Sequence, residues 1–98
     1  MKCSSLLAGA LALLPVAAQA EMTCGSSDGT QFIVNLALYP QTIEVNSDFL
    51  SLKSVKVGKD GIKRMTYRQD YGSASAILAT KDGYKPVLIK SGKQYTCG

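Results

Sequence analysis

The residues best suited to bind a charged partner lie in one stretch, YRQDYGSASAILATKDG, at residues 67–83. Tyr71 is followed there by small polar residues, including Ser73 and Ser75, and Lys81 comes later in the same stretch. Serine hydroxyls can donate hydrogen bonds to a carboxylate, and a lysine ammonium can pair with it. We therefore take Tyr71, Ser73, Ser75 and Lys81 as candidate partner-binding residues. The plainer interpretation is a loop leading into a core strand.

Catalytic chemistry has little support in the composition. The chain contains no histidine, the commonest acid–base group. No GxSxG motif or phosphate-binding loop occurs, and the acids lie mainly at turns, where aspartate serves backbone geometry. We expect a binding protein that is not an enzyme and that needs no cofactor.

Residues 1–20 have the features of a secretory signal peptide. Lys2 supplies positive charge, residues 6–14 are apolar, and residues 18–20 form a small-x-small cleavage pattern. The sequence therefore predicts cleavage after Ala20, one domain over residues 21–98, and a periplasmic or secreted location. The apolar run is too short to span a bilayer comfortably and no second run follows it, so we expect no transmembrane segment.

Cleavage would remove Cys3 and leave Cys24 and Cys97, each inside a Thr-Cys-Gly triplet at one end of the domain. Two cysteines in an oxidising compartment favour a disulfide. Without histidine they cannot complete a four-ligand zinc site, so we expect no metal. A bridge between them closes a loop of about 74 residues and stabilises the fold by roughly 4 kcal/mol in the entropic model.

The apolar residues of the domain alternate with a period of two, which is typical of half-buried β-strands. The alternation is found in TQFIVNLAL, QTIEVN, SVKV and IKRMTYRQ, and the segments SASAILAT and YKPVLIK are also strand-like. It sets Val55 and Val57 opposite Lys56, and it places Met65 and Tyr67 together on one side.

Turn signals separate these segments and suggest their arrangement. Asp-Gly or Ser-Gly dipeptides at 28–29, 60–61, 82–83 and 91–92 favour tight hairpins. The pattern predicts an all-β antiparallel meander of about seven or eight strands, with no helix after the signal peptide. A Cys24–Cys97 bridge between the first and last strands would seal a closed sheet, so we favour a small barrel over a stapled sandwich.

Charge is distributed unevenly along the domain. Residues 21–52 contain four acids and no base, whereas residues 53–98 contain ten bases and three acids. Such asymmetry suggests either an anionic partner or a set of lysines that protects strand edges. The candidate basic face, which would bind an anionic envelope polymer, consists of Lys53, Lys56, Lys59, Lys63, Arg64 and Arg68.

Tyrosines interleave with these bases at Tyr67, Tyr71, Tyr84 and Tyr95, a pattern that small nucleic-acid-binding barrels also use. Export separates the chain from most nucleic acid, which argues against that partner. The sequence favours a protein or an anionic envelope polymer as partner, and a monomer or weak dimer as the state of the chain.

The layout also resembles a known family. A first strand TCGSSDGTQFIVN, the segment YGSASAIL before KDG, and a final cysteine able to pair with the first are similar to the bacterial periplasmic inhibitors of C-type lysozyme. Tyr71, Ala76 and Leu78 match part of one family motif. The resemblance implies a small antiparallel β-barrel that inserts a loop into the enzyme's acidic cleft. It also implies that Ser73 or Ser75, together with Lys81, faces the two catalytic carboxylates.

Overall fold

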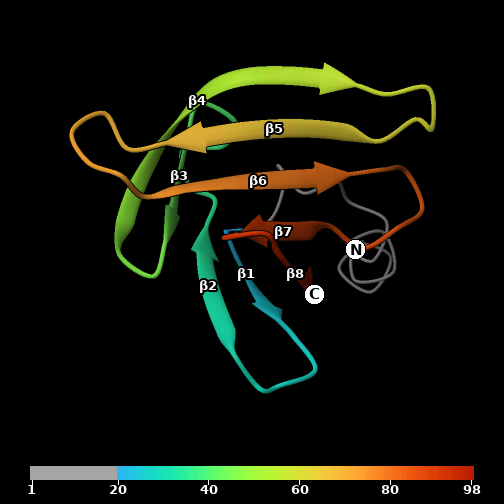
Figure 1. Ribbon diagram of the computed structural model, residues 1–98, viewed down its shortest axis with the longest axis horizontal. Helices are drawn as coiled ribbons and strands as arrows, with labels where there is room; N and C mark the ends of the chain where they lie inside the picture. The colour runs from blue at the N-terminus through green and yellow to red at the C-terminus, as the bar shows by residue number, and fades with distance from the viewer. Residues whose placement is uncertain (1–19) are drawn as a thin grey trace, which may run out of the picture.

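The computed structural model describes residues 20–98, which form eight antiparallel strands and no helix within that range (Figure 1). The predicted signal peptide, apart from Ala20, lies outside the described residues. The strands are β1 (Glu21–Gly25), β2 (Gln31–Asn35), β3 (Thr42–Val45), β4 (Asp48–Val57), β5 (Lys63–Arg68), β6 (Ser75–Thr80), β7 (Val87–Lys90) and β8 (Lys93–Cys97). They follow one another in chain order around a closed barrel, which confirms the predicted all-β meander barrel.

The barrel closes where β1 meets β8. Cys24 pairs directly with Cys97 across this seam, and Gly25 pairs with Thr96. The two sulfur atoms are bonded at 2.03 Å, so the predicted disulfide joins the first strand to the last.

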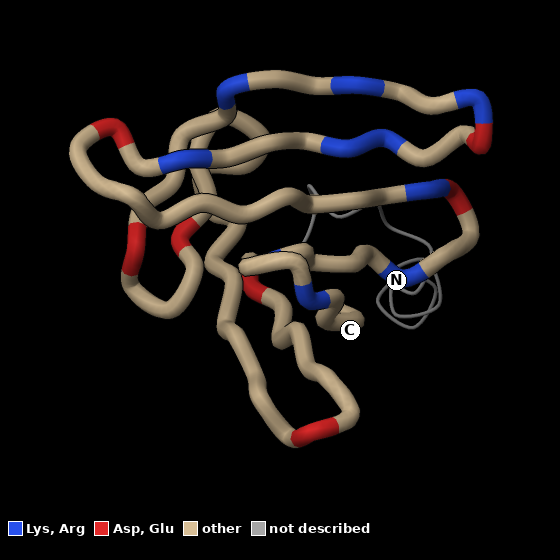
Figure 2. The backbone as a smooth tube through the Cα atoms, viewed as in Figure 1, with Lys and Arg blue, Asp and Glu red and all other residues tan. Residues whose placement is uncertain are grey.

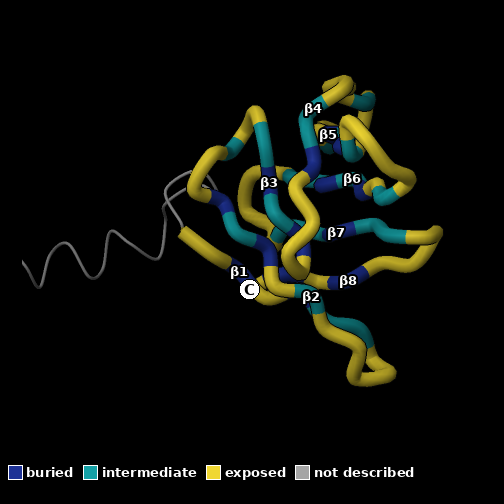
Figure 3. Tube along the Cα trace, turned by 90° about the vertical axis from the view of Figure 1, so that its left-hand side faces the viewer, coloured by how far each residue is buried: buried dark blue, intermediate teal, exposed yellow. Residues whose placement is uncertain are grey.

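The core consists of side chains that point into the barrel from alternate positions along the strands. The turns between strands are largely exposed (Figure 3). Met65 and Tyr67 of β5 are among the most deeply buried side chains, as their period-two pattern predicted. The other core members are Met22, Cys24, Val34, Leu36, Ile43, Val45, Leu50, Ala76, Leu78, Leu88, Tyr95 and Cys97. Within residues 20–98 no buried polar side chain lacks a hydrogen-bond partner.

One predicted strand is shorter than its alternation suggests. The pattern in residues 30–38 continues to Leu38, but β2 ends at Asn35. The side-chain oxygen of Asn35 accepts a hydrogen bond from the Ala37 N–H at 2.9 Å, which turns the chain out of the sheet. Leu38 is therefore 61% exposed, although its position in the pattern predicts an inward side chain.

A second difference lies in β4, which contains ten residues while its neighbour β3 contains four. Pairing with β3 ends at Ser51, and pairing with β5 continues to Val57 after a bulge between Leu52 and Ser54. The segment SVKV was predicted to be half-buried, but Val55 and Val57 are 47% and 67% exposed. Their side chains lie on the same face of the sheet as the core residue Met65. This part of the β4–β5 hairpin extends past β3, so β3 does not cover them.

Candidate recognition surfaces

The loop between β5 and β6, residues 69–74, is held in one shape by its own hydrogen bonds. The Gln69 N–H donates to the Ala74 carbonyl at 2.9 Å, and the Ala74 N–H donates to the Gln69 side-chain oxygen at 3.2 Å. Gly72 leaves room for that side chain, because a Cβ at this position would overlap Gln69 Oε1. The loop is therefore preorganised at its base.

Asp70 fixes the same loop to the neighbouring strand β4. Its carboxylate accepts hydrogen bonds from Lys53 Nζ at 2.8 Å and from Ser51 Oγ at 3.1 Å. These bonds, first from Lys53 and then from Ser51, hold the pKa of Asp70 below its ordinary value. The cationic charge of Lys53, a predicted member of the basic face, is thereby largely neutralised.

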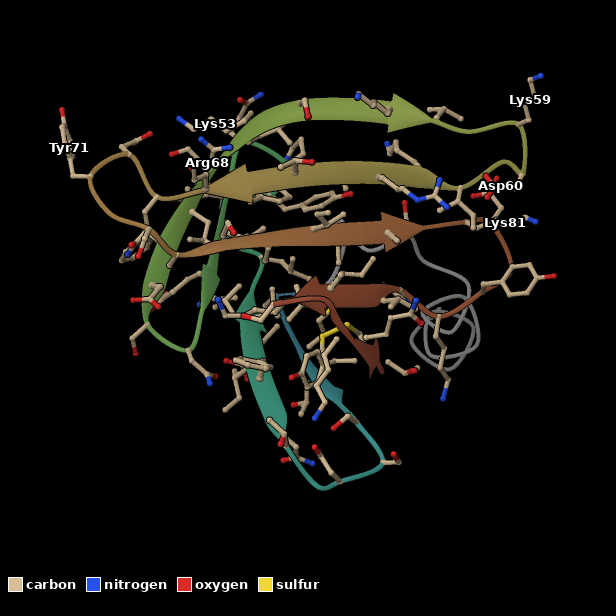
Figure 4. The ribbon with its side chains drawn as sticks, viewed as in Figure 1. Lys53, Lys59, Asp60, Arg68, Tyr71 and Lys81 are labelled. Atoms are coloured by element: carbon tan, nitrogen blue, oxygen red, sulfur yellow. A yellow bond between two sulfur atoms is a disulfide. The ribbon has the colours of Figure 1, made fainter. Side chains whose placement is uncertain are left out.

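Tyr71 stands at the tip of this loop and is 101% exposed, so it contacts no core residue (Figure 4). Ser73 is also exposed in the loop, and Ser75 is the exposed first residue of β6. The Ser75 carbonyl accepts a hydrogen bond from Lys90 Nζ at 3.2 Å. Three of the four candidate partner-binding residues therefore lie at one end of the β5–β6 hairpin.

Lys81 lies at the opposite end of β6, as Figure 4 shows. Strand β6 pairs from Ser75, opposite Arg68, to Thr80, opposite Lys63. The six residue steps from Ser75 to Lys81 along this extended segment span about 20 Å. The structure therefore does not bring Lys81 together with Tyr71, Ser73 and Ser75.

Arg68 is the cation that does lie beside this loop. It is the last residue of β5, it faces outward, and it pairs with Ser75 on β6 and with Ser51 on β4. The ion pairs within residues 20–98 involve Lys53, Arg64 and Lys93, so Arg68 has no acidic partner there. The alternation in β5 already predicts that Arg68 points outward, but only the fold shows that Arg68, and not Lys81, lies beside the loop.

The predicted basic face divides between the two ends of the barrel. Lys53 and Arg68 are near the β5–β6 loop, whereas Lys59 lies at the other end, on the β4–β5 turn (Figure 4). Lys56, Lys63 and Arg64 belong to the end of the β4–β5 ladder next to that turn. We call this second group the distal basic cluster: Lys56 from β4, Lys59 from the β4–β5 turn, Lys63 and Arg64 from β5, and Lys81 and Lys85 from the β6–β7 connection. Sequence reasoning included neither Lys81 nor Lys85 in the basic face.

The distal basic cluster is built by two turns that touch. Lys81 Nζ lies 5.1 Å from the centre of the Tyr84 ring, and Lys81 Cε is 3.6 Å from the position of a Cβ on Gly61. Asp60 accepts hydrogen bonds from the Ile62 N–H at 3.0 Å and from Arg64 Nη2 at 3.2 Å. These bonds lower the pKa of Asp60, the backbone bond contributing most.

The acidic half of the sequence forms a different surface. Glu21, Asn35 and Glu44 are successive partners across β1, β2 and β3 on the outside of the barrel. They line a depression of about 400 Å³ together with Ile33, Asn46 and Ser47. The acidic depression and the distal basic cluster therefore occupy different parts of the barrel, as Figure 2 illustrates, whereas Lys93 of the basic half pairs with Asp28 of the acidic half.

Residues 20–98 bring no three potential metal ligands together, and they contain no helix that could cross a membrane. No protein-family model, no curated protein and no solved structure matches this chain.

Proposed function

We propose that this chain is an exported binding protein that inserts its β5–β6 loop into a cleft of a partner protein, in the manner of the C-type lysozyme inhibitors that it resembles. The observation that carries the proposal is the combination of a fully exposed Tyr71 and a braced loop base. Tyr71 is 101% exposed, while Asp70 at its side is bonded to Lys53 and Ser51.

An exposed tyrosine on a preorganised loop is suited to act as a binding anchor. Aromatic residues that fill a partner's pocket often dominate interface energetics. A loop that is already ordered loses less conformational entropy when it binds. The hydrogen bonds between Gln69 and Ala74 supply that order before any partner arrives.

An acidic cleft would meet a cation and a hydroxyl at this end of the barrel. Arg68 has no acidic partner within residues 20–98, and Ser73 is exposed in the loop. Arginine can bind a carboxylate through two parallel hydrogen bonds. Lys81 is too far along β6 to take part, so Arg68 would take the role that the family resemblance implied for Lys81.

The test is the turnover of a C-type lysozyme in the presence of excess oxidised protein. We expect inhibition that Tyr71→Ala weakens by about tenfold or more. Tyr84→Ala is the matched control, because Tyr84 is an exposed tyrosine at the other end of the barrel. Unchanged turnover with the unaltered protein would remove lysozyme as the target, and equal effects of the two variants would remove the loop as the site.

A second function, binding of an anionic envelope polymer, is favoured by the distal basic cluster. Its two turns are in contact, so their lysines act as one surface. Polymer binding should weaken steeply with added salt. Replacing both Lys59 and Lys81 with glutamate should abolish retention of the protein on immobilised lipopolysaccharide, whereas Tyr71→Ala should leave it unchanged. Retention that salt does not affect would count against this function.

A further inference from the structure

Part of one edge of β4 is unpaired, although the eight strands of residues 20–98 close in a ring. Pairing of β4 with β3 ends at Ser51, but β4 continues for six residues to Val57. Over Lys53–Val57, β5 lies on one side, and no strand of residues 20–98 lies on the other. All five of these residues are exposed, and the segment forms the upper border of the molecule in Figure 1.

The backbone groups that face this open edge can be assigned from the hairpin turn. The Gly58 N–H donates to the Ile62 carbonyl at 3.0 Å, so the backbone N–H and C=O groups of Gly58 point toward the β5 side of the hairpin. Backbone groups alternate in direction along an antiparallel strand. The backbone N–H and C=O groups of Ser54 and Lys56 therefore point toward β5. Those of Val55 and Val57 point to the open edge.

The side chains along the edge are also sorted by face. Val55 and Val57 lie on the face that carries Met65, whereas Ser54 and Lys56 lie on the other. Lys56 is directly opposite Arg64, an unfavourable pair of like charges. Arg64 is bonded to Asp60, but Lys56 has no acidic partner among the described residues.

We infer that this edge accepts an extended acidic peptide segment of a partner protein as an additional strand. The backbone of the segment would bond to Val55 and Val57, as in other recognition by strand addition. Its apolar residues would pack beside the two valines, and an acidic residue on the opposite face would pair with Lys56. The expected ligand is thus a strand in which apolar and acidic residues alternate.

A second copy of this chain is a poor occupant for the same edge. Antiparallel pairing of two such edges would bring Lys56 of one copy close to Lys56 of the other. Lysines and bulges on an edge strand are recognised obstacles to self-association. The bulge between Leu52 and Ser54 adds to this obstacle, so charge favours an acidic partner over a dimer. This surface does not depend on the proposed role of Tyr71.

The experiment is a titration of the full oxidised chain with a short peptide of alternating glutamate and valine. We expect the amides of Val55 and Val57 to become protected from solvent exchange, because they gain acceptors. The amides of Ser54 and Lys56 should change little, because they already face β5. The same peptide with alternate backbone nitrogens methylated is the control. If it binds equally well, or if Val55 and Val57 gain no protection, strand addition is wrong.

Two variants separate backbone pairing from charge. Val55→Pro removes an edge donor without removing a bond to β5, and it should weaken binding about tenfold relative to Val55→Thr. Lys56→Glu should shift preference about two- to fivefold toward a lysine–valine peptide, and it remains informative if proline disturbs the hairpin. Equal binding by the proline and threonine variants, or unchanged preference after Lys56→Glu, would overturn the inference.

Discussion

Cys24 and Cys97 face each other directly across the seam of the barrel, with their Cα atoms 3.9 Å apart. The ladder at this seam contains two residue pairs, whereas the ladder between β5 and β6 contains six. The Gly98 N–H adds one further bond, to the Thr23 carbonyl at 3.1 Å. The covalent link therefore reinforces a seam whose backbone pairing is as short as that between β2 and β3.

Reduction of this disulfide should destabilise the protein strongly. The two cysteines are separated by 73 positions in sequence, so the reduced unfolded chain gains much conformational freedom. We expect a loss of about 4 kcal/mol in the free energy of unfolding. Urea denaturation with and without a reductant measures this difference. The double variant in which serine replaces both cysteines is the control, and its stability should not respond to the reductant.

Tyr67→Phe should remove one partly buried hydrogen bond. The Tyr67 hydroxyl donates to the Pro40 carbonyl at 2.7 Å, and the ring is completely buried. Loss of the donor removes this bond and should cost about 1 kcal/mol in the free energy of unfolding. Tyr84→Phe, at an exposed site, should change stability little by the same denaturation measurement. Equal effects of the two variants would contradict the assigned bond.

Alkaline pH should destabilise the barrel partly through the same tyrosine. Burial, and secondarily Tyr39, raise the pKa of Tyr67 above its ordinary value of 10.0. The folded state thus holds a proton that the unfolded state releases. The resulting stabilisation is complete below about pH 10 and is lost as the pH rises toward the higher pKa of the folded state. Burial of Tyr39 acts in the same direction, since it also raises the pKa of that residue.

The measurement is the free energy of unfolding between about pH 9 and pH 11, the range around the ordinary tyrosine pKa. Tyr67→Phe should make the decline with pH shallower without abolishing it, because Tyr39 still contributes. Lys93 contributes as well, because its hydrogen bond to Asp28 raises its pKa. An identical slope for the variant and the unaltered protein would show that the Tyr67 proton is not linked to folding.

Asp70→Asn should loosen the β5–β6 loop while the barrel stays folded. The substitution removes the charge that holds Lys53 at 2.8 Å, at a site exposed to solvent. Amide exchange in residues 69–74 should accelerate, with little change in global stability. Asp82→Asn is the control, since Asp82 lies in a different turn. If loop exchange is the same in both variants, Asp70 does not brace the loop.

Acid should produce the same loosening in the unaltered protein. The pKa of Asp70 is lowered by its bonds to Lys53 and Ser51, so the carboxylate stays charged below the ordinary value of 3.8. The contribution of the brace is therefore present above that value and is lost as the pH falls through the lower pKa of the folded state. Protonation of Asp70 can be followed by its carboxyl chemical shift, and loosening of the loop by amide exchange in residues 69–74. The two should occur over the same pH range.

Gly61→Ala should be costly because of backbone conformation. Gly61 has a φ of 80°, a region that side chains other than glycine disfavour, in the turn between β4 and β5. We expect a loss of about 1 kcal/mol, measured by thermal unfolding. Gly25→Ala is the control, because a Cβ there would make only an ordinary contact, 3.6 Å from Gln31 Cγ. A larger loss at Gly25 would contradict this explanation.

The fold was largely predictable because its determinants are local. Alternation of Met65 and Tyr67 with polar neighbours indicates which face of β5 is buried, and the structure buries both. The Asp60-Gly61 and Asp82-Gly83 turns occur where the dipeptides predicted them, with positive φ at each glycine. If cleavage removes Cys3, only Cys24 and Cys97 remain to pair within the chain, and the structure shows that pair.

The candidate surfaces depended on tertiary structure, because a residue's neighbours are set by strand lengths and register. Val55 and Val57 have the parity of core residues, but β3 ends before it can cover them, and this leaves the edge of β4 open. Lys81 follows Ser75 closely in sequence, yet an extended strand carries it to the far end of the barrel, and Arg68 takes its place beside Tyr71. The face of a strand on which a side chain lies follows from the local alternation of the sequence. Whether a neighbouring strand covers that face depends on how far the neighbour extends, which is set by the tertiary structure.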